Sequence, residues 1–228
     1  KELEPKVAIV TGSSSGLGEA ITRSLLNQDY LVFGGSRSES AIIHNNFIDL
    51  ELDVRSESSV KSFYSEVLKE TEVVDLFVNN AGICEMSSLG ETASKEFANH
   101  FATNVLGSFH MLKALEPFLI EDETLIINIL STASLEAYPG TSSYTANESA
   151  KKALAEVVEK EWSKYHLRFT NLILGAVNTP IWNDYEDIDV DQMLSISQVM
   201  ETVNFLVKSS SESKFAEIVL QPRKSFLK

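Results

Sequence analysis

The sequence predicts an α/β fold, in which a doubly wound sheet of about seven parallel strands carries helices on both faces. Short apolar runs alternate with longer amphipathic stretches along the chain, and this alternation is typical of β–α units. The composition is that of a globular protein, with 43% hydrophobic and 23% charged residues. The 228 residues show no internal change of composition, so a single domain over residues 1–228 is expected.

Seven short runs carry the strand pattern. Most of them are continuous apolar stretches, as expected for strands that are buried on both faces of a parallel sheet. The third run alternates apolar and polar residues, as a half-buried strand does. In chain order the predicted strands are Lys6–Val10, Leu31–Phe33, Phe47–Asp53, Val73–Val78, Thr124–Leu130, Phe169–Leu174 and Phe215–Leu220.

The stretches between these runs have the helical period. Val60, Phe63 and Val67 illustrate the spacing of three and four positions, with acids early in the stretch and a lysine late. The predicted helices are Leu17–Gln28, Ser56–Lys69, Lys95–Leu119 (ending near Pro117), Tyr144–Lys164 and Asp191–Val207. The one long irregular segment, Thr179–Asp191, carries five acids and weakly favours a neutral or cationic substrate.

Charge and cysteine content exclude several classes of partner. The formal net charge is −14, which repels nucleic acid phosphates and anionic lipid, and no apolar run is long enough to span a bilayer. We therefore expect no nucleic acid and no membrane partner. Cys84 is the single cysteine and cannot form an internal disulfide, which favours the cytoplasm. The chain starts at Lys1, and the sequence leaves open whether a targeting segment precedes it.

A glycine-bearing turn joins the first predicted strand to the first predicted helix. It reads Thr11-Gly12-Ser13-Ser14-Ser15-Gly16-Leu17-Gly18. Glycines permit a tight turn and a close backbone approach, and a helix N-terminus offers free N–H groups to a phosphate. An ordinary βα turn is the alternative, but the strand–turn–helix context favours phosphate binding.

The spacing Thr-Gly-x3-Gly-x-Gly resembles the cofactor turn of the short-chain dehydrogenase/reductase family, and other motifs follow in that family's order over about residues 6–207. Asp53-Val54 resembles the pair after the third strand that contacts adenine. Asn79-Asn80-Ala81-Gly82 resembles the motif after the fourth strand, and Gly175-Ala176-Val177-Asn178-Thr179-Pro180 the segment that clamps the nicotinamide carboxamide. The resemblance implies a Rossmann-like oxidoreductase of the short single-domain subgroup, which transfers a hydride between a nicotinamide cofactor and a small-molecule carbonyl or alcohol.

The resemblance also implies a set of cofactor-binding residues. The second strand leads into Ser36-Arg37, where NAD-specific relatives carry an acid for the ribose 2′-hydroxyl. A hydroxyl followed by a guanidinium suits a 2′-phosphate, so NADP(H) is expected to be preferred over NAD(H); the alternative is that Arg37 is only a surface residue. The set comprises Gly12, Ser14, Ser15, Gly16, Leu17, Gly18, Ser36, Arg37, Asp53, Val54, Asn80, Ala81, Gly82, Glu148, Gly175, Val177 and Thr179.

The catalytic roles are implied in the same way. Tyr144 is the expected general acid/base, and Ser131, which precedes it by 13 positions, is expected to hold the same substrate oxygen. Asn104, within Asn104-Val105-Leu106-Gly107, is expected to anchor a water in the proton relay. Taken alone, Tyr144 would be read as a tyrosine at the start of a helix. The histidines show no metal-ligand spacing, so no metal is expected.

Glu148 departs from the family's Tyr-x-x-x-Lys pattern. That lysine bonds the nicotinamide ribose and lowers the tyrosine pKa, whereas a carboxylate raises it, although Glu148 can still accept hydrogen bonds from ribose hydroxyls. On this basis Glu148→Lys is expected to speed carbonyl reduction. Lys151 lies on nearly the same helix face as Tyr144, about 10 Å further along. Either Lys151 partly compensates for the missing lysine, or Lys151 and Lys152 are solvated helix lysines.

Two functions follow from these residues. The first is an NADP-dependent carbonyl reductase; the alternative is a catalytically weak or inactive relative that binds the cofactor and acts as a sensor or interaction subunit. A homodimer is expected, because the predicted helices Lys95–Leu119 and Tyr144–Lys164 resemble the family's dimer helices. Ala150, Ala153 and Ala155 would allow close helix approach, unless they only face the sheet. The last strand lacks the family's Asp-Gly-Gly-like turn, which disfavours a tetramer.

Overall fold

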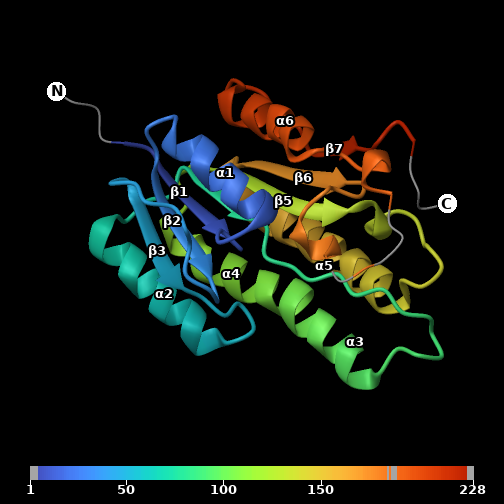
Figure 1. The fold of residues 1–228 in the computed structure, drawn as a ribbon. Coiled ribbons are helices and arrows are strands. Elements are labelled where there is room, and N and C mark those ends of the chain that lie inside the picture. The colour runs from blue at the N-terminus through green and yellow to red at the C-terminus, as the bar shows by residue number, and fades with distance from the viewer. Residues whose placement is uncertain (1–4, 184, 186–188, 225–228) are drawn as a thin grey trace.

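One parallel sheet organises the chain. The computed structural model describes residues 5–183, 185 and 189–224, and its seven strands follow the order β3-β2-β1-β4-β5-β6-β7 (Figure 1). Every neighbouring pair is parallel, which confirms the predicted doubly wound α/β fold. The strands are β1 (Val7–Thr11), β2 (Leu31–Ser36), β3 (Phe47–Glu51), β4 (Leu76–Asn79), β5 (Leu125–Ser131), β6 (Arg168–Leu174) and β7 (Glu217–Leu220).

Helices cover both faces of the sheet (Figure 1). On one face lie α1 (Gly16–Leu26) and α6 (Ile196–Lys208); on the other lie α2 (Glu57–Glu70), α4 (Gly107–Leu115) and α5 (Ser142–Glu161). A further helix, α3 (Ser94–His100), runs into α4 through the π-helical turn Phe101–Leu106. No helix among residues 5–183, 185 and 189–224 combines the length and the apolar composition needed to cross a bilayer.

The central strands are mostly apolar because each face of the sheet packs against helices, whereas the edge strand β3 alternates apolar and polar residues. Ala8 and Val10 join the core cluster that includes α1 and α6 residues, while Ile9 joins the cluster of α2, α4 and α5 residues. These three β1 residues are fully buried. Successive strand residues point to opposite faces, so two cores are built from one continuous apolar run.

Several predicted boundaries differ from the observed ones by a few residues, and the start of the last helix is one of them. The last helix begins at Ile196 instead of Asp191, because Ser195 and Gln198 form a capping box at this point. Asp189 caps only a short 3₁₀ turn, Val190–Gln192. Of the acids in the segment 179–191, Asp184, Glu186 and Asp187 lie outside the described residues.

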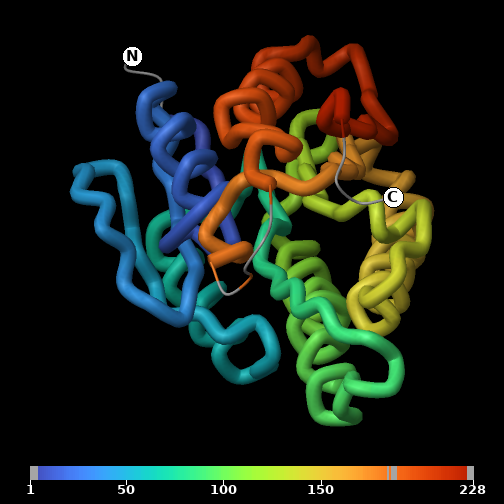
Figure 2. Tube along the Cα trace, turned by 45° about the vertical axis from the view of Figure 1, so that its right-hand side comes forward, coloured from blue at the N-terminus to red at the C-terminus, as the bar shows by residue number. Residues whose placement is uncertain are grey.

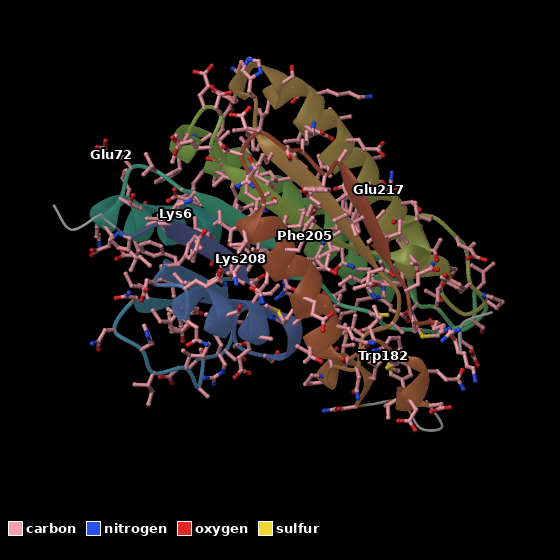
Figure 3. The ribbon with its side chains drawn as sticks, turned by 90° about the horizontal axis from the view of Figure 1, so that it is seen from above. Lys6, Glu72, Trp182, Phe205, Lys208 and Glu217 are labelled. Carbon is pink, nitrogen blue, oxygen red and sulfur yellow. The ribbon has the colours of Figure 1, made fainter. Side chains whose placement is uncertain are left out.

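The chain reverses its direction across the sheet between β1 and β4. β2 and β3 lie on one side of β1, and β4 to β7 lie on the other. In a doubly wound sheet, ligands bind beyond the carboxyl ends of the strands at such a switch point. Figure 3 shows Trp182, which follows β6, on the side of the molecule opposite Lys6, which precedes β1. A functional site is therefore expected on the carboxyl-end side of the sheet.

Candidate active site

A cavity of about 520 Å³ lies at this edge of the sheet. Its lining includes every residue expected to be catalytic and every residue expected to bind the cofactor. The structure thus brings together segments from Gly12 to Thr179 that are far apart in sequence. Figure 2 shows the segment after β6 returning beside the N-terminal part of the chain, and Thr179 lies close to Gly16.

The glycine turn forms a close-fitting cradle. Gly12 and Gly16 have φ values of +70° and +54°, which favour glycine. A Cβ atom on Gly18 would lie 2.0 Å from the Gly12 carbonyl oxygen. Ser15 is the N-cap of α1, but its side chain makes no capping hydrogen bond. The first N–H groups of α1 therefore have no side-chain cap, and the turn fits a phosphate group.

The Asn79–Gly82 segment braces this turn. Thr11 Oγ1 accepts hydrogen bonds from the backbone N–H groups of Asn80 and Ala81, each at 2.9 Å. In return, Asn80 Nδ2 donates to the Thr11 carbonyl oxygen at 2.9 Å. The ends of β1 and β4 are thereby tied together across the switch point.

Two guanidinium groups line the outer corner of the cavity. Arg37 is exposed, and Ser36 Oγ donates to the Ser38 carbonyl oxygen at 2.6 Å. Arg55 binds the Asp53 carboxylate through Nε at 2.9 Å and Nη2 at 2.7 Å. This contact holds the pKa of Asp53 below its usual value. Arg55 was not expected at the site; the one signal in the sequence was its place two residues after Asp53.

Ser131 and Tyr144 meet inside the cavity. Ser131 ends β5, and Tyr144 lies in the first turn of α5. Burial raises the pKa of Tyr144 well above its usual value, and Glu148 and Cys84 raise it further, while a hydrogen bond with the Ser131 side chain opposes them. The Tyr144 hydroxyl is therefore protonated at neutral pH and able to donate a proton.

Glu148 sits among hydrogen-bond donors. It is 3% exposed; its Oε1 accepts from Asn104 Nδ2 at 3.2 Å, and its Oε2 accepts from the backbone N–H of Ser131 at 2.9 Å. Burial raises the pKa of Glu148, and the Lys151 ammonium is the largest influence that lowers it. This environment suits a carboxylate. A lysine at position 148 would face two N–H donors and the Lys151 ammonium. The faster carbonyl reduction expected of Glu148→Lys therefore does not fit the structure.

Lys151 is not solvated, so that interpretation is wrong for Lys151, whereas Lys152 is partly exposed. Lys151 is 3% exposed, lines the cavity and donates from Nζ to the Ile129 carbonyl oxygen at 2.8 Å. Burial lowers the pKa of Lys151, and Glu148 opposes this effect. Lys152 forms ion pairs with Glu156 and Glu217.

Asn104 lies in the π-helical turn before α4, and π turns are frequent at functional sites. Its Oδ1 accepts from the backbone N–H of Ile83 at 2.9 Å, and its Nδ2 donates to the Ile83 carbonyl oxygen at 2.9 Å and to Glu148. Both amide hydrogens thus have protein partners. The role of Asn104 as a water anchor stays a prediction.

The remaining wall of the cavity is mostly apolar. It is formed by side chains that the sequence did not identify, because they lie in irregular segments without a motif: Ile83, Cys84, Met86, Ala133, Tyr138, Ile181 and Trp182. Burial, Glu148 and Glu85 raise the pKa of Cys84 to about 12. Its thiol is therefore protonated at neutral pH and contributes packing surface.

Comparison with known proteins agrees with this geometry. An uncharacterized oxidoreductase of Staphylococcus saprophyticus is 26% identical over 236 residues, covering 97% of this chain and 99% of that protein. The 2-(R)-hydroxypropyl-CoM dehydrogenase of Xanthobacter autotrophicus is 31% identical over 226 residues, covering 88% and 90%. The structure of an alcohol dehydrogenase from Thermococcus sibiricus, complexed with 5-hydroxy-NADP, has a TM-score of 0.86 and 28% identity, covering 99% of this chain and 100% of that one. The family model for short chain dehydrogenases matches residues 6–189, and the chain belongs to this family of oxidoreductases.

Proposed function

We propose that this single-domain protein is an NADP(H)-dependent reductase of small carbonyl compounds. The observation that carries the proposal is the cluster formed by Ser131, Tyr144, Asn104 and Glu148 in the same cavity as the uncapped glycine turn. The cofactor, when bound, supplies the hydride. The chain binds the cofactor phosphate in the glycine turn, holds the substrate oxygen and donates the proton.

The hydroxyl groups of Ser131 and Tyr144 have different roles at the substrate oxygen. Ser131 holds the carbonyl oxygen, and Tyr144 Oη donates a proton to it as the hydride reaches the carbon. The raised pKa of Tyr144 keeps this proton in place below about pH 10, so the hydroxyl is in the form that a proton donor needs in carbonyl reduction. The apolar wall supports a neutral, largely apolar substrate.

The direct test is NADPH oxidation, followed by absorbance, against a panel of ketones and aldehydes. We expect turnover of at least one apolar carbonyl, and lower activity on carbonyls that carry a phosphate or several carboxylates. If NADPH binds and no carbonyl is reduced, the second function is correct: a catalytically inactive relative that senses the cofactor. The observation that favours this second function is the buried Glu148 carboxylate, which disfavours the tyrosinate form of Tyr144.

We expect the protein to bind NADPH more tightly than NADH, because the Arg37 guanidinium lines the cavity and suits a 2′-phosphate. Arg37→Ala should weaken NADPH binding about tenfold, the equivalent of about 1.4 kcal/mol, and leave NADH binding unchanged. Fluorescence titration measures both constants. Arg23→Ala is the control, because Arg23 pairs with Glu19 on α1. Equal affinities for the two cofactors, or a preference that survives Arg37→Ala, would contradict the proposal.

We further propose a homodimer that forms through α3, α4 and α5. Phe97, Phe101 and Phe109 are spaced at helical intervals on the α3–α4 helix, and each is more than 40% exposed, as is Val157 on α5. Exposed apolar patches of this kind mark interfaces. Ala153 is exposed, in keeping with such an interface, whereas Ala155 packs into the core.

Phe101→Glu should convert this dimer to a monomer in sedimentation experiments at micromolar concentration. Phe205→Glu is the matched control, because Phe205 is 51% exposed on α6, which covers the other face of the sheet (Figure 3). A wild-type monomer, or a dimer that only Phe205→Glu disrupts, would rule out the proposed interface.

A further inference from the structure

The segment Ile83–Met86, here called the wall loop, forms part of the cavity wall, and side chains from other elements hold its backbone. The Asn104 side chain forms hydrogen bonds with both the backbone N–H and the backbone carbonyl of Ile83, the first residue of the wall loop. The backbone N–H of Glu85 donates to His100 Nε2 at 3.0 Å. The N–H of the last residue donates to Tyr185 Oη at 2.7 Å. The wall loop is therefore positioned by these contacts and is not a free connection.

His100 ties the wall loop to α5, the helix that carries Tyr144. It is the last residue of α3 and is fully buried. A backbone N–H can only donate, so Nε2 accepts from Glu85 and is unprotonated. Nδ1 therefore carries the proton and donates it to Ser143 Oγ, which lies 2.6 Å away. Ser143 adjoins Tyr144, whose ring centroid is 6.2 Å from that of His100.

We propose that His100 is a positioning residue: as the neutral imidazole it holds the wall loop and the Tyr144 turn together, and on protonation it releases them. The proposal rests on the proposed reductase function for its kinetic consequence, but the contact itself does not depend on that function. Protonation would turn Nε2 into a donor that faces the Glu85 N–H, so the hydrogen bond between them would be replaced by repulsion.

The surroundings of the His100 ring have opposing effects on its pKa. The carboxylates of Glu85 and Glu96 raise the pKa of His100, but burial lowers it by more, and the net shift is downward. A pKa below the unfolded value means that this contribution to stability is present above about pH 6.5 and is lost as the pH falls below it. Glu85, Glu96 and His100 have possible metal-ligand atoms within 4.8 Å of one another. Both nitrogens of the His100 ring, however, already form hydrogen bonds with the protein.

The test compares His100→Gln with His100→Ala. A glutamine amide offers one acceptor and one donor, as the neutral imidazole does, and does not titrate. We expect kcat/KM of the wild type to fall between about pH 6.5 and about pH 5 and that of His100→Gln to lack this fall. The kcat/KM of His100→Ala should be lower than that of His100→Gln on the order of 10- to 100-fold at every pH, as expected for a misplaced wall. His44→Gln, at an exposed loop position, should keep the wild-type profile.

Hydrogen exchange at the Glu85 amide gives a second measurement that needs no substrate. In the wild type, its protection should decrease as the pH falls below about 6.5, in step with the His100 ring titration. It should stay constant in His100→Gln. An acid limb shared by the wild type and His100→Gln, or a Glu85 protection that does not follow the His100 titration, overturns the proposal. If the wild type reduces no carbonyl, only the reductase function fails, and hydrogen exchange still decides the role of His100.

Discussion

Tyr144→Phe is expected to lower kcat for carbonyl reduction by about 10²–10⁴, the usual contribution of general acid catalysis. The substitution removes one hydroxyl and leaves the ring in its place beside His100. Because the hydroxyl is the only group removed, NADPH binding and the melting temperature should change little. Stopped-flow measurement of NADPH oxidation with one accepted carbonyl gives the effect on the reduction rate, and fluorescence titration gives the effect on NADPH binding.

Tyr165→Phe is the matched control for this experiment. The Tyr165 hydroxyl donates to Glu116 Oε1 at 3.2 Å, outside the cavity lining, so the rate should stay at the wild-type level. A Tyr144→Phe variant that retains more than about a tenth of the wild-type rate would show that another group, or water, protonates the substrate oxygen.

Most of the fold follows from local patterns in the sequence. The apolar runs predict all seven strands, because a strand buried between two helix layers has to be apolar on both sides. The motif residues could be placed at one cavity because the carboxyl ends of parallel strands meet at one edge of the sheet. The start of the last helix was predicted too early, because an acid at 191 is as good a cap in isolation as Ser195. The capping box with Gln198 decided between them.

The chemistry of individual side chains was less predictable. Helix geometry placed Lys151 on the side of Tyr144, but the sequence could not show that its ammonium is buried and bonded to the Ile129 carbonyl. Nor could it show that Glu148 lies among donors, because these come from β5 and from the turn before α4. His100 had no motif at all. Its role depends on contacts with residues 15 and 43 positions away, which no local pattern encodes.

Lys151→Met is expected to destabilise the fold by about 3–5 kcal/mol, because it leaves the buried Glu148 carboxylate without its compensating charge. The pKa of Glu148 is already raised by burial, and Lys151 is the main influence that lowers it. A carboxyl group with a raised folded-state pKa costs stability as the pH rises through that pKa. The loss in Lys151→Met should therefore grow as the pH rises above about 4.5, the unfolded value of a glutamate, which chemical denaturation at several pH values measures.

The double variant Glu148→Gln/Lys151→Met removes both charges and should recover most of this stability, since replacing a whole buried pair is often neutral. Glu148→Lys should be destabilised, because it sets an ammonium group against the donors of Asn104 and Ser131 and adds a second positive charge near Lys151. Lys160→Met, at an exposed position on the same helix, should stay within about 0.5 kcal/mol of the wild type. A stable, fast Glu148→Lys variant would show that this environment rearranges to accept an ammonium.

The rates of the same variants decide whether Lys151 compensates for the lysine that is missing at position 148. Glu148 and Lys151 both line the cavity. The Lys151 ammonium would therefore face a cofactor bound there, and it also offsets the charge of the Glu148 carboxylate. If the double variant recovers stability but its kcat stays below that of Glu148→Gln alone, the ammonium assists proton donation by Tyr144. If stability and kcat recover together, Lys151 serves only as the counter-ion of Glu148. Titration of NADPH into the double variant then shows whether the loss, where there is one, lies in binding or in the chemical step.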